Sequence, residues 1–389
     1  MSAEVAYDQL DDSVQQVSIE TILSSDGAWT DQQNVLDKRV AEYLSDEDLD
    51  AISLSEFLLT IAQFKLQLYH SSTLFENTSI FGLGTGLDFD VDVCTLPAGQ
   101  LVVAKRVKLL TPLHRRDGSS VSDLSRRVRK VLQEIRILKH APVENCDSIL
   151  NIVGASLEDV SGDFTAPSLV LEYAEFGTLR HYLLKSSSPR PMQEKQELCL
   201  QVGRALLTLH NCGICHGDVK LDNVLVVRDQ DGKGSAKVAD FGSSIIIQSD
   251  NLKKTYWGTN AYNAPEVRSS DNTQSGVAVG TDLLFACDVF SFGLLLYESL
   301  HDGVPYWKAH KNEVPTIQTA LDISNFEGCE DTEHDQSDST RVVCFRRAIG
   351  LSLVPLPEER RQLRPILEAI AGNTDGLYVL ISSNSTKNR

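Results

Sequence analysis

Apolar residues recur at helical spacing in two parts of the chain. The first follows residues 45–48 (Ser-Asp-Glu-Asp), a sequence typical of a helix N-terminus, and extends to about residue 70. The second covers residues 123–140. The apolar positions are Leu54, Phe57, Leu58, Ile61 and Leu68 in the first part, and Val128, Val131, Leu132, Ile135 and Leu138 in the second. This pattern predicts one or two amphipathic helices over about 46–70 and a longer helix over 123–140.

Strand patterns lie between these two regions. Over 81–93, apolar residues alternate with other residues around a glycine cluster, 84–86 (Gly-Thr-Gly), a pattern that an ordinary hairpin also gives. A Pro-Ala-Gly turn at 97–99 leads into the apolar run 101–104, which Lys105 follows. A lysine in this position most often marks the solvent-exposed end of a strand. The pattern alone therefore predicts strands and assigns no chemistry.

Charge divides the chain into two regions. The 389 residues are 42% hydrophobic and 23% charged, as in soluble globular proteins, and carry a formal net charge of -18. Residues 1–79 hold fifteen Asp and Glu against three Lys and Arg, which is most of the excess acid. Residues 1–44 show no clear periodicity, so disorder or a loosely attached helix is expected there. The acidic balance argues against a nucleic-acid partner.

The N-terminus has no basic region followed by an apolar run, and no stretch approaches the ~18 apolar residues of a membrane span. Eight cysteines in a long chain fit reduced thiols. We therefore expect no membrane span and a cytoplasmic location, with the nucleus as an alternative. Cys212 and Cys215 have the spacing of a redox pair, but buried structural thiols are the reading to prefer.

One short polar loop contains a set of side chains that could catalyse a reaction. Residues 214–226 place Asp218, Lys220 and Asn223 between apolar segments, after a helix expected over about 193–209. Transfer of a phosphoryl group to a hydroxyl needs a carboxylate to orient the hydroxyl, a cation for the moving charge and an oxygen ligand for Mg²⁺. The three side chains supply these in that order. A plain turn is the alternative, because Gly, Asp and Asn favour turns.

This loop resembles the catalytic loop of eukaryotic protein kinases, with Gly217 where most members have Arg. Further motifs of the family follow in the expected order: the glycine loop at 84–91 with Phe89 for the third glycine, the strand ending at Lys105, Glu134 in the helix called αC, Asp-Phe-Gly at 240–242, Gly-Thr-x-x-Tyr-x-Ala-Pro-Glu at 258–266 and Asp288-Val-Phe-Ser at the start of a buried helix. The 258–266 motif is typical of serine/threonine kinases, and Lys220 in the catalytic loop points the same way. The variant loop is similar to divergent kinases of filamentous fungi.

The resemblance implies an α+β, bilobal fold. The N-lobe, about 80–173, is expected to hold a five-stranded antiparallel sheet and the αC helix, and the C-lobe, about 174–372, to be mainly helical. The kinase domain would then cover 80–372, between an acidic extension, 1–79, and a tail, 373–389.

The resemblance also implies the site residues and the cofactors, ATP and Mg²⁺. Asp218 is expected to be the catalytic base, and Lys220, Asn223 and Thr259 to complete the catalytic set. Asn223 and Asp240 are expected to bind the metal. The expected nucleotide-binding residues are Gly84, Gly86, Val91, Ala104, Lys105, Glu134, Glu172, Ala174 and Leu225. Asp288 should hold the loop backbone, and Arg360 should pair with Glu266.

These expectations predict a serine/threonine protein kinase that acts on protein hydroxyls. Two alternatives stay open. A small-molecule phosphotransferase of the aminoglycoside or choline type has a similar loop but lacks the 258–266 segment. A scaffold on a kinase fold is suggested by Phe89 and by Phe290, which replaces the Trp of the family.

Two hypotheses concern regulation. Because Gly217 removes the Arg that pairs with a phosphorylated activation loop, activity should not depend on phosphorylation of that loop. The acidic segment 1–79 is expected to dock on a basic patch around the αC helix, with a solubilising tail as the alternative. This patch comprises Arg115, Arg116, Arg126, Arg127, Arg129 and Lys130.

Overall fold

The computed structural model describes residues 46–71, 74, 82–85, 89–107, 120–159, 165–186, 188–247, 253–268, 276–309, 317–322 and 336–372. Contacts between residues group the chain into two compact units, Met1–Leu44 and Ser45–Arg389. All the described residues belong to the second unit. The expectations for 1–44 and 373–389, and the side chains of Arg115, Arg116 and Arg126, lie outside this description.

The first half of the described chain is built on one sheet. Five strands pair in the antiparallel manner expected, in the order β5-β6-β4-β3-β2, and a sixth, β1, pairs in parallel with the outer side of β5. The strands are β1 (Gln67–His70), β2 (Gly82–Thr85), β3 (Phe89–Thr95), β4 (Leu101–Val107), β5 (Ile152–Asp159) and β6 (Thr165–Glu172). The fold class is therefore the one predicted, with one strand more than expected.

The extra strand corrects the helix expected over 46–70. Helix α3 covers Asp46–Gln63, and two residues later Lys65 has a φ of 51°, in the left-handed region, so the helix cannot continue through it. Residues 67–70 then run as β1, and Leu68, assigned above to the apolar helix face, is 42% exposed on that strand. A four-residue stretch with one apolar position does not distinguish a helix end from a strand.

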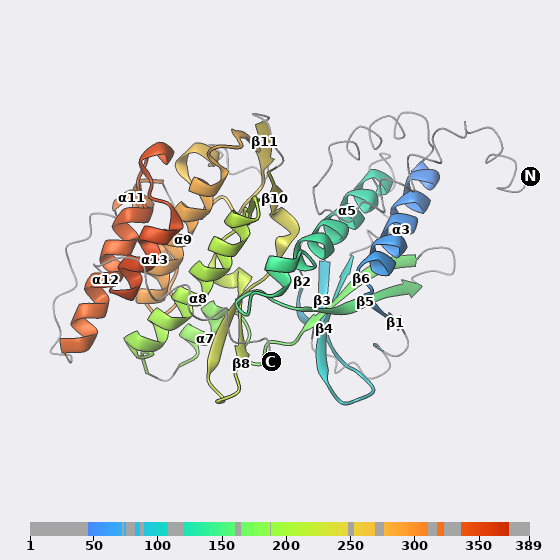
Figure 1. The fold of residues 1–389 in the computed structure, drawn as a ribbon, viewed down its shortest axis with the longest axis horizontal. Helices are drawn as coiled ribbons and strands as arrows, with labels where there is room; N and C mark the ends of the chain where they lie inside the picture. The colour runs from blue at the N-terminus through green and yellow to red at the C-terminus, as the bar shows by residue number, and fades with distance from the viewer. Residues whose placement is uncertain are drawn as a thin grey trace, which may run out of the picture. The chain divides into compact units, whose positions relative to one another are not determined.

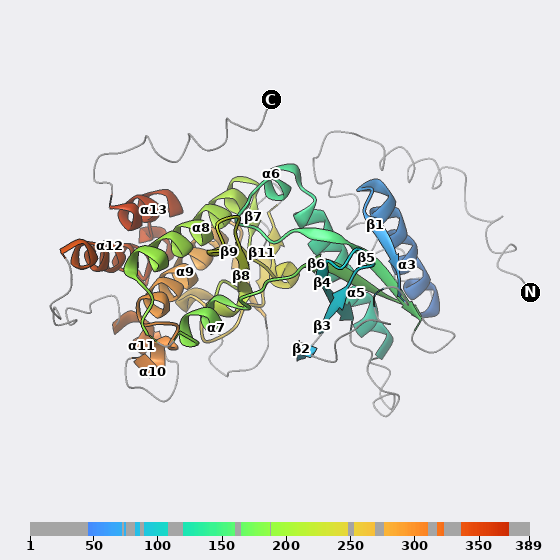
Figure 2. The ribbon, with the colours of Figure 1, turned by 90° about the horizontal axis from the view of Figure 1, so that it is seen from below.

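Helix α3 packs against α5 (Ser120–Leu138), the predicted αC helix, and the two run side by side in Figure 1, while in Figure 2 strands of the sheet lie in front of α5. Phe57 and Ile61 are buried in the same apolar cluster as Val131 and Ile135 of α5. The Arg136 guanidinium lies 2.6 Å from the Glu56 carboxylate. The compact unit therefore begins at Ser45, and the expected domain start at residue 80 falls inside it, because α3 supplies part of the core.

The second half is mainly helical, as predicted (Figure 1). Helix α9 is buried along almost its entire length and packs against α8 and α12, while α13 packs against both α8 and α12. The helices of this half are α7 (Leu179–Leu184), α8 (Met192–Asn211), α9 (Leu284–Leu300), α10 (Tyr306–Ala309), α11 (Ile317–Asp322), α12 (Gln336–Ser352) and α13 (Leu363–Ala371), while the short α6 (Ala141–Glu144) lies between α5 and β5. This half also contains three two-stranded ribbons. They pair β8 (Val224–Arg228) with β9 (Gly234–Val238), β7 (Ile214–Cys215) with β10 (Ile245–Ile246), and β11 (Lys253–Tyr256) with β12 (Val277–Gly280).

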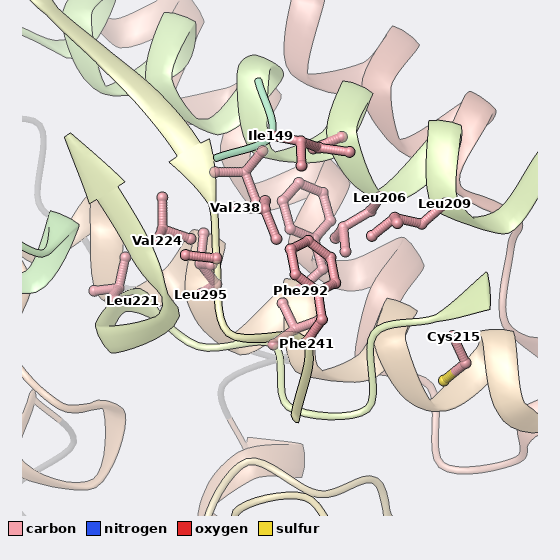
Figure 3. Close-up of a cluster of buried hydrophobic side chains, with 14 of the residues drawn as sticks. Ile149, Leu206, Leu209, Cys215, Leu221, Val224, Val238, Phe241, Phe292 and Leu295 are labelled. Atoms are coloured by element: carbon pink, nitrogen blue, oxygen red, sulfur yellow. The ribbon is translucent and has the colours of Figure 1, made fainter. Parts of the chain in front are cut away.

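A buried apolar cluster supports the predicted catalytic loop from below. Figure 3 shows side chains from α8, α9, β8 and β9 converging around Phe241, which follows Asp240. The labelled members are Ile149, Leu206, Leu209, Cys215, Leu221, Val224, Val238, Phe241, Phe292 and Leu295. Because packed interiors resist deformation, the loop rests on a rigid base.

Among the described residues, no helix combines the length and the apolar character that crossing a membrane requires.

Candidate active site

Lys105 is the centre of the first cluster of charges. Its Nζ lies 2.7 Å from Glu134 Oε2 of α5 and 2.9 Å from Asp240 Oδ1, and the Lys105 and Glu134 side chains are only 10% and 2% exposed. Burial disfavours the charge on Lys105, but the two carboxylates outweigh it and hold the lysine pKa above its ordinary value. Lys105 in turn holds the pKa of the Asp240 carboxyl well below its usual range. The ion pair between Lys105 and Glu134 that the sequence predicted is therefore formed.

The register of the sheet corrects the expectation for Ala104. Val91 stands opposite Lys105 and Val93 opposite Val103, so these four residues share one face of the sheet. Ala104 points to the other face, where it is fully buried in a separate cluster with Val102 and Val170. Because side chains alternate along a strand, the residue that accompanies Lys105 on the nucleotide face is Val103.

Phe89, which replaces the third glycine, lies at the start of β3 on the same face as Lys105. Its side chain is buried, and Lys105 Nζ lies 4.8 Å from the centre of its ring, within range of a cation–π interaction. Gly84 pairs with Val91 across β2 and β3, while Gly86 lies outside the described residues. The phenylalanine thus contacts the lysine itself, which the sequence pattern did not indicate.

Asp218 is the centre of the second cluster. Its Oδ2 accepts hydrogen bonds from Lys220 Nζ at 2.7 Å and Asn223 Nδ2 at 2.8 Å, and its Oδ1 accepts one from the Thr259 backbone N–H at 2.9 Å. Burial raises the pKa of Asp218, but the charge of Lys220 and the hydrogen bonds from Lys220 and Thr259 outweigh it, so the pKa is below its ordinary value. The carboxylate is therefore ionised at neutral pH, as a proton acceptor must be.

Lys220 connects the loop to a segment distant in sequence. Besides Asp218, its Nζ donates to Thr259 Oγ1 at 2.6 Å. Thr259 therefore contacts the carboxylate through its backbone and the lysine through its hydroxyl. The structure thus brings together all four predicted catalytic residues, Asn223 included.

Asn223 and Asp240 present the oxygen atoms that a hard divalent cation binds. The Asn223 amide nitrogen donates to both the backbone oxygen and Oδ2 of Asp218, at 2.8 Å each, so its carbonyl oxygen is turned away from Asp218. The Asp240 side chain is 51% exposed even though Oδ1 contacts Lys105. This donor set fits Mg²⁺.

Asp288 holds the loop from beneath, as predicted. Its Oδ2 accepts from the His216 backbone N–H at 2.7 Å and its Oδ1 from the Gly217 backbone N–H at 2.9 Å, while His210 Nε2 lies 3.0 Å from Oδ2. The His216 ring packs against Phe241 at 5.3 Å between centres, and Leu138 belongs to the same buried cluster. The catalytic loop is therefore fixed to α9 through its backbone.

The segment that contains Thr259 is anchored at its end by the predicted ion pair of Glu266 and Arg360. Arg360 is fully buried, and its guanidinium donates to both Glu266 oxygens and to the backbone oxygens of Val354, Pro355 and Ala286. All five N–H donors of the guanidinium are used.

Residues 83–360 match the protein kinase domain family, and this range includes every described element of the site. The chain belongs to the protein kinase family. Among its relatives, the probable serine/threonine-protein kinase gdt4 of Dictyostelium discoideum is 32% identical over 148 residues, 38% of this chain and 8% of that protein.

Two further relatives come from other organisms. The glycogen synthase kinase-3 homolog YGK3 of Saccharomyces cerevisiae is 30% identical over 164 residues, 40% of each chain. The CBL-interacting protein kinase 3 of Oryza sativa subsp. japonica is 31% identical over 189 residues, 46% of this chain and 39% of that protein. This kinase chain thus aligns with less than half of each of these relatives.

The segment that joins the two lobes of this kinase contains Glu172 and Ala174, whose backbone groups are expected to bind a nucleotide. The Glu172 N–H donates to Asn151 O, and its carboxylate contacts the Asn151 backbone N–H and Lys237. The Ala174 carbonyl accepts from the Gly177 N–H. Leu225 lies in β8, directly after the catalytic loop, and its side chain is partly exposed.

One ion network was missed by the sequence analysis. Arg180 of α7 donates to Asp222 of the catalytic loop, to the buried Glu298 of α9 and to the Tyr262 hydroxyl. Nothing in the spacing of the sequence pairs residue 180 with residue 298. An arginine in the first turn of a short helix is most simply read as a solvated charge.

Proposed function

We propose that this chain is a serine/threonine protein kinase that transfers the γ-phosphoryl group of ATP to hydroxyl groups of proteins. The observation that carries the proposal is the position of Lys220, whose ammonium contacts both Asp218 and Thr259 and so joins the catalytic loop to the segment typical of serine/threonine kinases. The names of all three relatives above contain the word kinase, which supports the reaction class.

Each group of the site has a role in this reaction. The Glu172 carbonyl and the Ala174 N–H would bind the adenine edge, with Val91, Val103 and Leu225 on its faces. Lys105, held by Glu134, would contact the α- and β-phosphates. Asn223 and Asp240 would hold Mg²⁺, which neutralises the phosphate charge when bound.

The acceptor hydroxyl would be oriented by Asp218, which accepts its proton as the new oxygen–phosphorus bond forms and the bond between the γ-phosphorus and the departing ADP breaks. Lys220 lies beside this carboxylate and would stabilise the negative charge on the moving phosphoryl group. Thr259 fixes both groups in place, so the base and the cation stay at a constant distance.

The test is phosphate transfer from labelled ATP and Mg²⁺ to a generic Ser/Thr protein substrate, with wild type and Asp218→Asn compared. Removing the base should lower kcat by roughly 10²- to 10⁴-fold and leave ATP binding intact. Labelling of choline or an aminoglycoside in place of protein would favour the small-molecule alternative. ATP binding without transfer to either class would favour the scaffold.

We also propose that the activity does not need phosphorylation of the activation loop. Within the described part of that loop, Tyr256 is 1% exposed and pairs within the ribbon β11–β12, so it is not available to a modifying enzyme. Replacing Ser249 and Thr255 together by Ala should leave the rate within about twofold of wild type. A large loss of activity would contradict the proposal.

The location and the role of the N-terminal segment are also proposals. Every cysteine in the described residues is a free thiol, and burial raises the pKa of both Cys212 and Cys215, which supports a reducing compartment and inert structural thiols rather than a redox switch. If 1–44 docks on the basic patch, deleting it should change the rate in a salt-dependent way. If the deletion variant and the full chain have the same rate at both low and high salt, the segment acts only as a solubilising tail.

A further inference from the structure

Gly217 brings two parts of the activation segment directly against the catalytic loop. Its φ is +79°, and a Cβ at this position would overlap the Ser243 carbonyl oxygen. A Cβ on Gly258, at the other end of the segment, would overlap the Gly217 carbonyl oxygen. Backbone therefore packs on backbone at both contacts, and a longer residue at 217 would separate them.

A chain of hydrogen bonds holds the first of these contacts in place. Gln133 Nε2 of α5 donates to the Ser244 backbone oxygen at 2.5 Å, and Ser244 Oγ donates to the His216 backbone oxygen at 3.0 Å. Ser244 is 6% exposed, and the next residues, β10, pair with β7 just before the catalytic loop. Three separate elements are thus joined through one serine.

These two hydrogen bonds lie where they can act on both clusters of the site. Gln133 directly precedes Glu134, the partner of Lys105, and His216 lies two residues before Asp218. A displacement of Ser244 would therefore act on the helix that positions the nucleotide lysine and on the loop that carries the base. Kinases that are switched by phosphorylation order the activation loop with a new arginine–phosphate pair. Here hydrogen bonds between uncharged groups join the start of the segment to both elements.

We infer that Gln133 and Ser244 are positioning residues that fix the active arrangement without phosphorylation. The inference rests on the proposed function and names the groups that make the kinase activity independent of activation-loop phosphorylation. Neither residue contacts the reacting atoms. Their effect passes through Glu134 and through the backbone of the catalytic loop.

The experiment uses the full chain after phosphatase treatment, with mass spectrometry to show that no phosphate remains. The variants are Ser244→Ala and Gln133→Met, which remove the donors with little change in size, and their double mutant. Matched controls are Ser352→Ala and Gln196→Met, because these side chains also donate to backbone oxygens, of Ala348 and Ile370, in the helical half.

Wild type should keep its full rate after phosphatase treatment. Each single variant should lose about 3- to 10-fold in kcat/KM, the effect of one lost hydrogen bond, while the controls stay within twofold. The double mutant should lose little more than the worse single variant, because both act through the same chain. Trypsin should cut the activation segment after Lys253 or Lys254 faster in both variants than in the controls.

Two results would overturn the inference. One is that the variants match the controls in transfer rate and in trypsin cleavage; the other is that phosphatase treatment abolishes the activity of the wild type. A wild type that never transfers phosphate would refute the proposed function instead. In that case the cleavage rates still decide whether Gln133 and Ser244 hold the segment.

Discussion

Replacing Arg360 by Lys should destabilise this kinase strongly although the charge is kept. The guanidinium uses five N–H donors on Glu266 and three backbone oxygens, and its side chain is fully buried. An ammonium has three donors, so at least two acceptors lose their partner. An unsatisfied buried acceptor costs about 1–3 kcal/mol. We therefore expect the free energy of unfolding to fall by about 3 kcal/mol.

Chemical denaturation followed by circular dichroism measures this change. The matched control is Arg204→Lys, because Arg204 forms an exposed pair with Glu197 at 3.4 Å, and such a pair should contribute less than about 0.5 kcal/mol. Losses that differ by less than about 1 kcal/mol between the two variants would refute the reasoning. They would mean that Lys at 360, with bound water, satisfies the same acceptors.

Three further predictions follow from single contacts. Gly217→Ala should lower both kcat and the free energy of unfolding, the latter by about 1–3 kcal/mol, because its φ and the Ser243 oxygen leave no room for a methyl group; an unchanged rate and denaturation midpoint would contradict this. Phe57→Ala should cost about 3–5 kcal/mol in chemical denaturation, since Phe57 is fully buried between α3 and the rest of the core; a loss below about 1 kcal/mol would show that α3 is not part of the core. Lys105 keeps the pKa of Asp240 below its ordinary value, so the stability that this carboxylate adds should be present at pH 7 and disappear as the pH falls below about 4. The difference in denaturation midpoint between wild type and Asp240→Asn should shrink over that range, and a constant difference would count against the ion pair.

The residues proposed as base and metal ligands could be predicted from the sequence as a set, because that chemistry restricts both residue type and order. The structure brings Asn223 into contact with Asp218 and places Asp240 beside Lys105. The partners of buried charges were predictable for a similar reason. Glu266 and Asp288 needed a cation or backbone N–H groups nearby, and Arg360 and the catalytic loop supply them.

Residues that act through backbone atoms could not be predicted in the same way. Gln133 and Ser244 bond to carbonyl oxygens, which every residue has, so no pairing is visible in the sequence. Ala104 is a different case. The twofold period of a strand already places Val103, and not its neighbour, on the face of Lys105, so this error was avoidable. Strand β1 was missed because four residues are too few to show a period.

The similarity to other kinases starts at residue 83, whereas β1 and α3 precede it. A shortened chain begun at that residue would leave β5 as an open sheet edge and would uncover the apolar side of α5 that Phe57 and Ile61 contact. Open edges and bare apolar surfaces promote self-association. The matched domain, 83–360, and the compact unit that begins at Ser45 therefore have different borders in this protein, and a truncation placed by homology alone would cut through the compact unit.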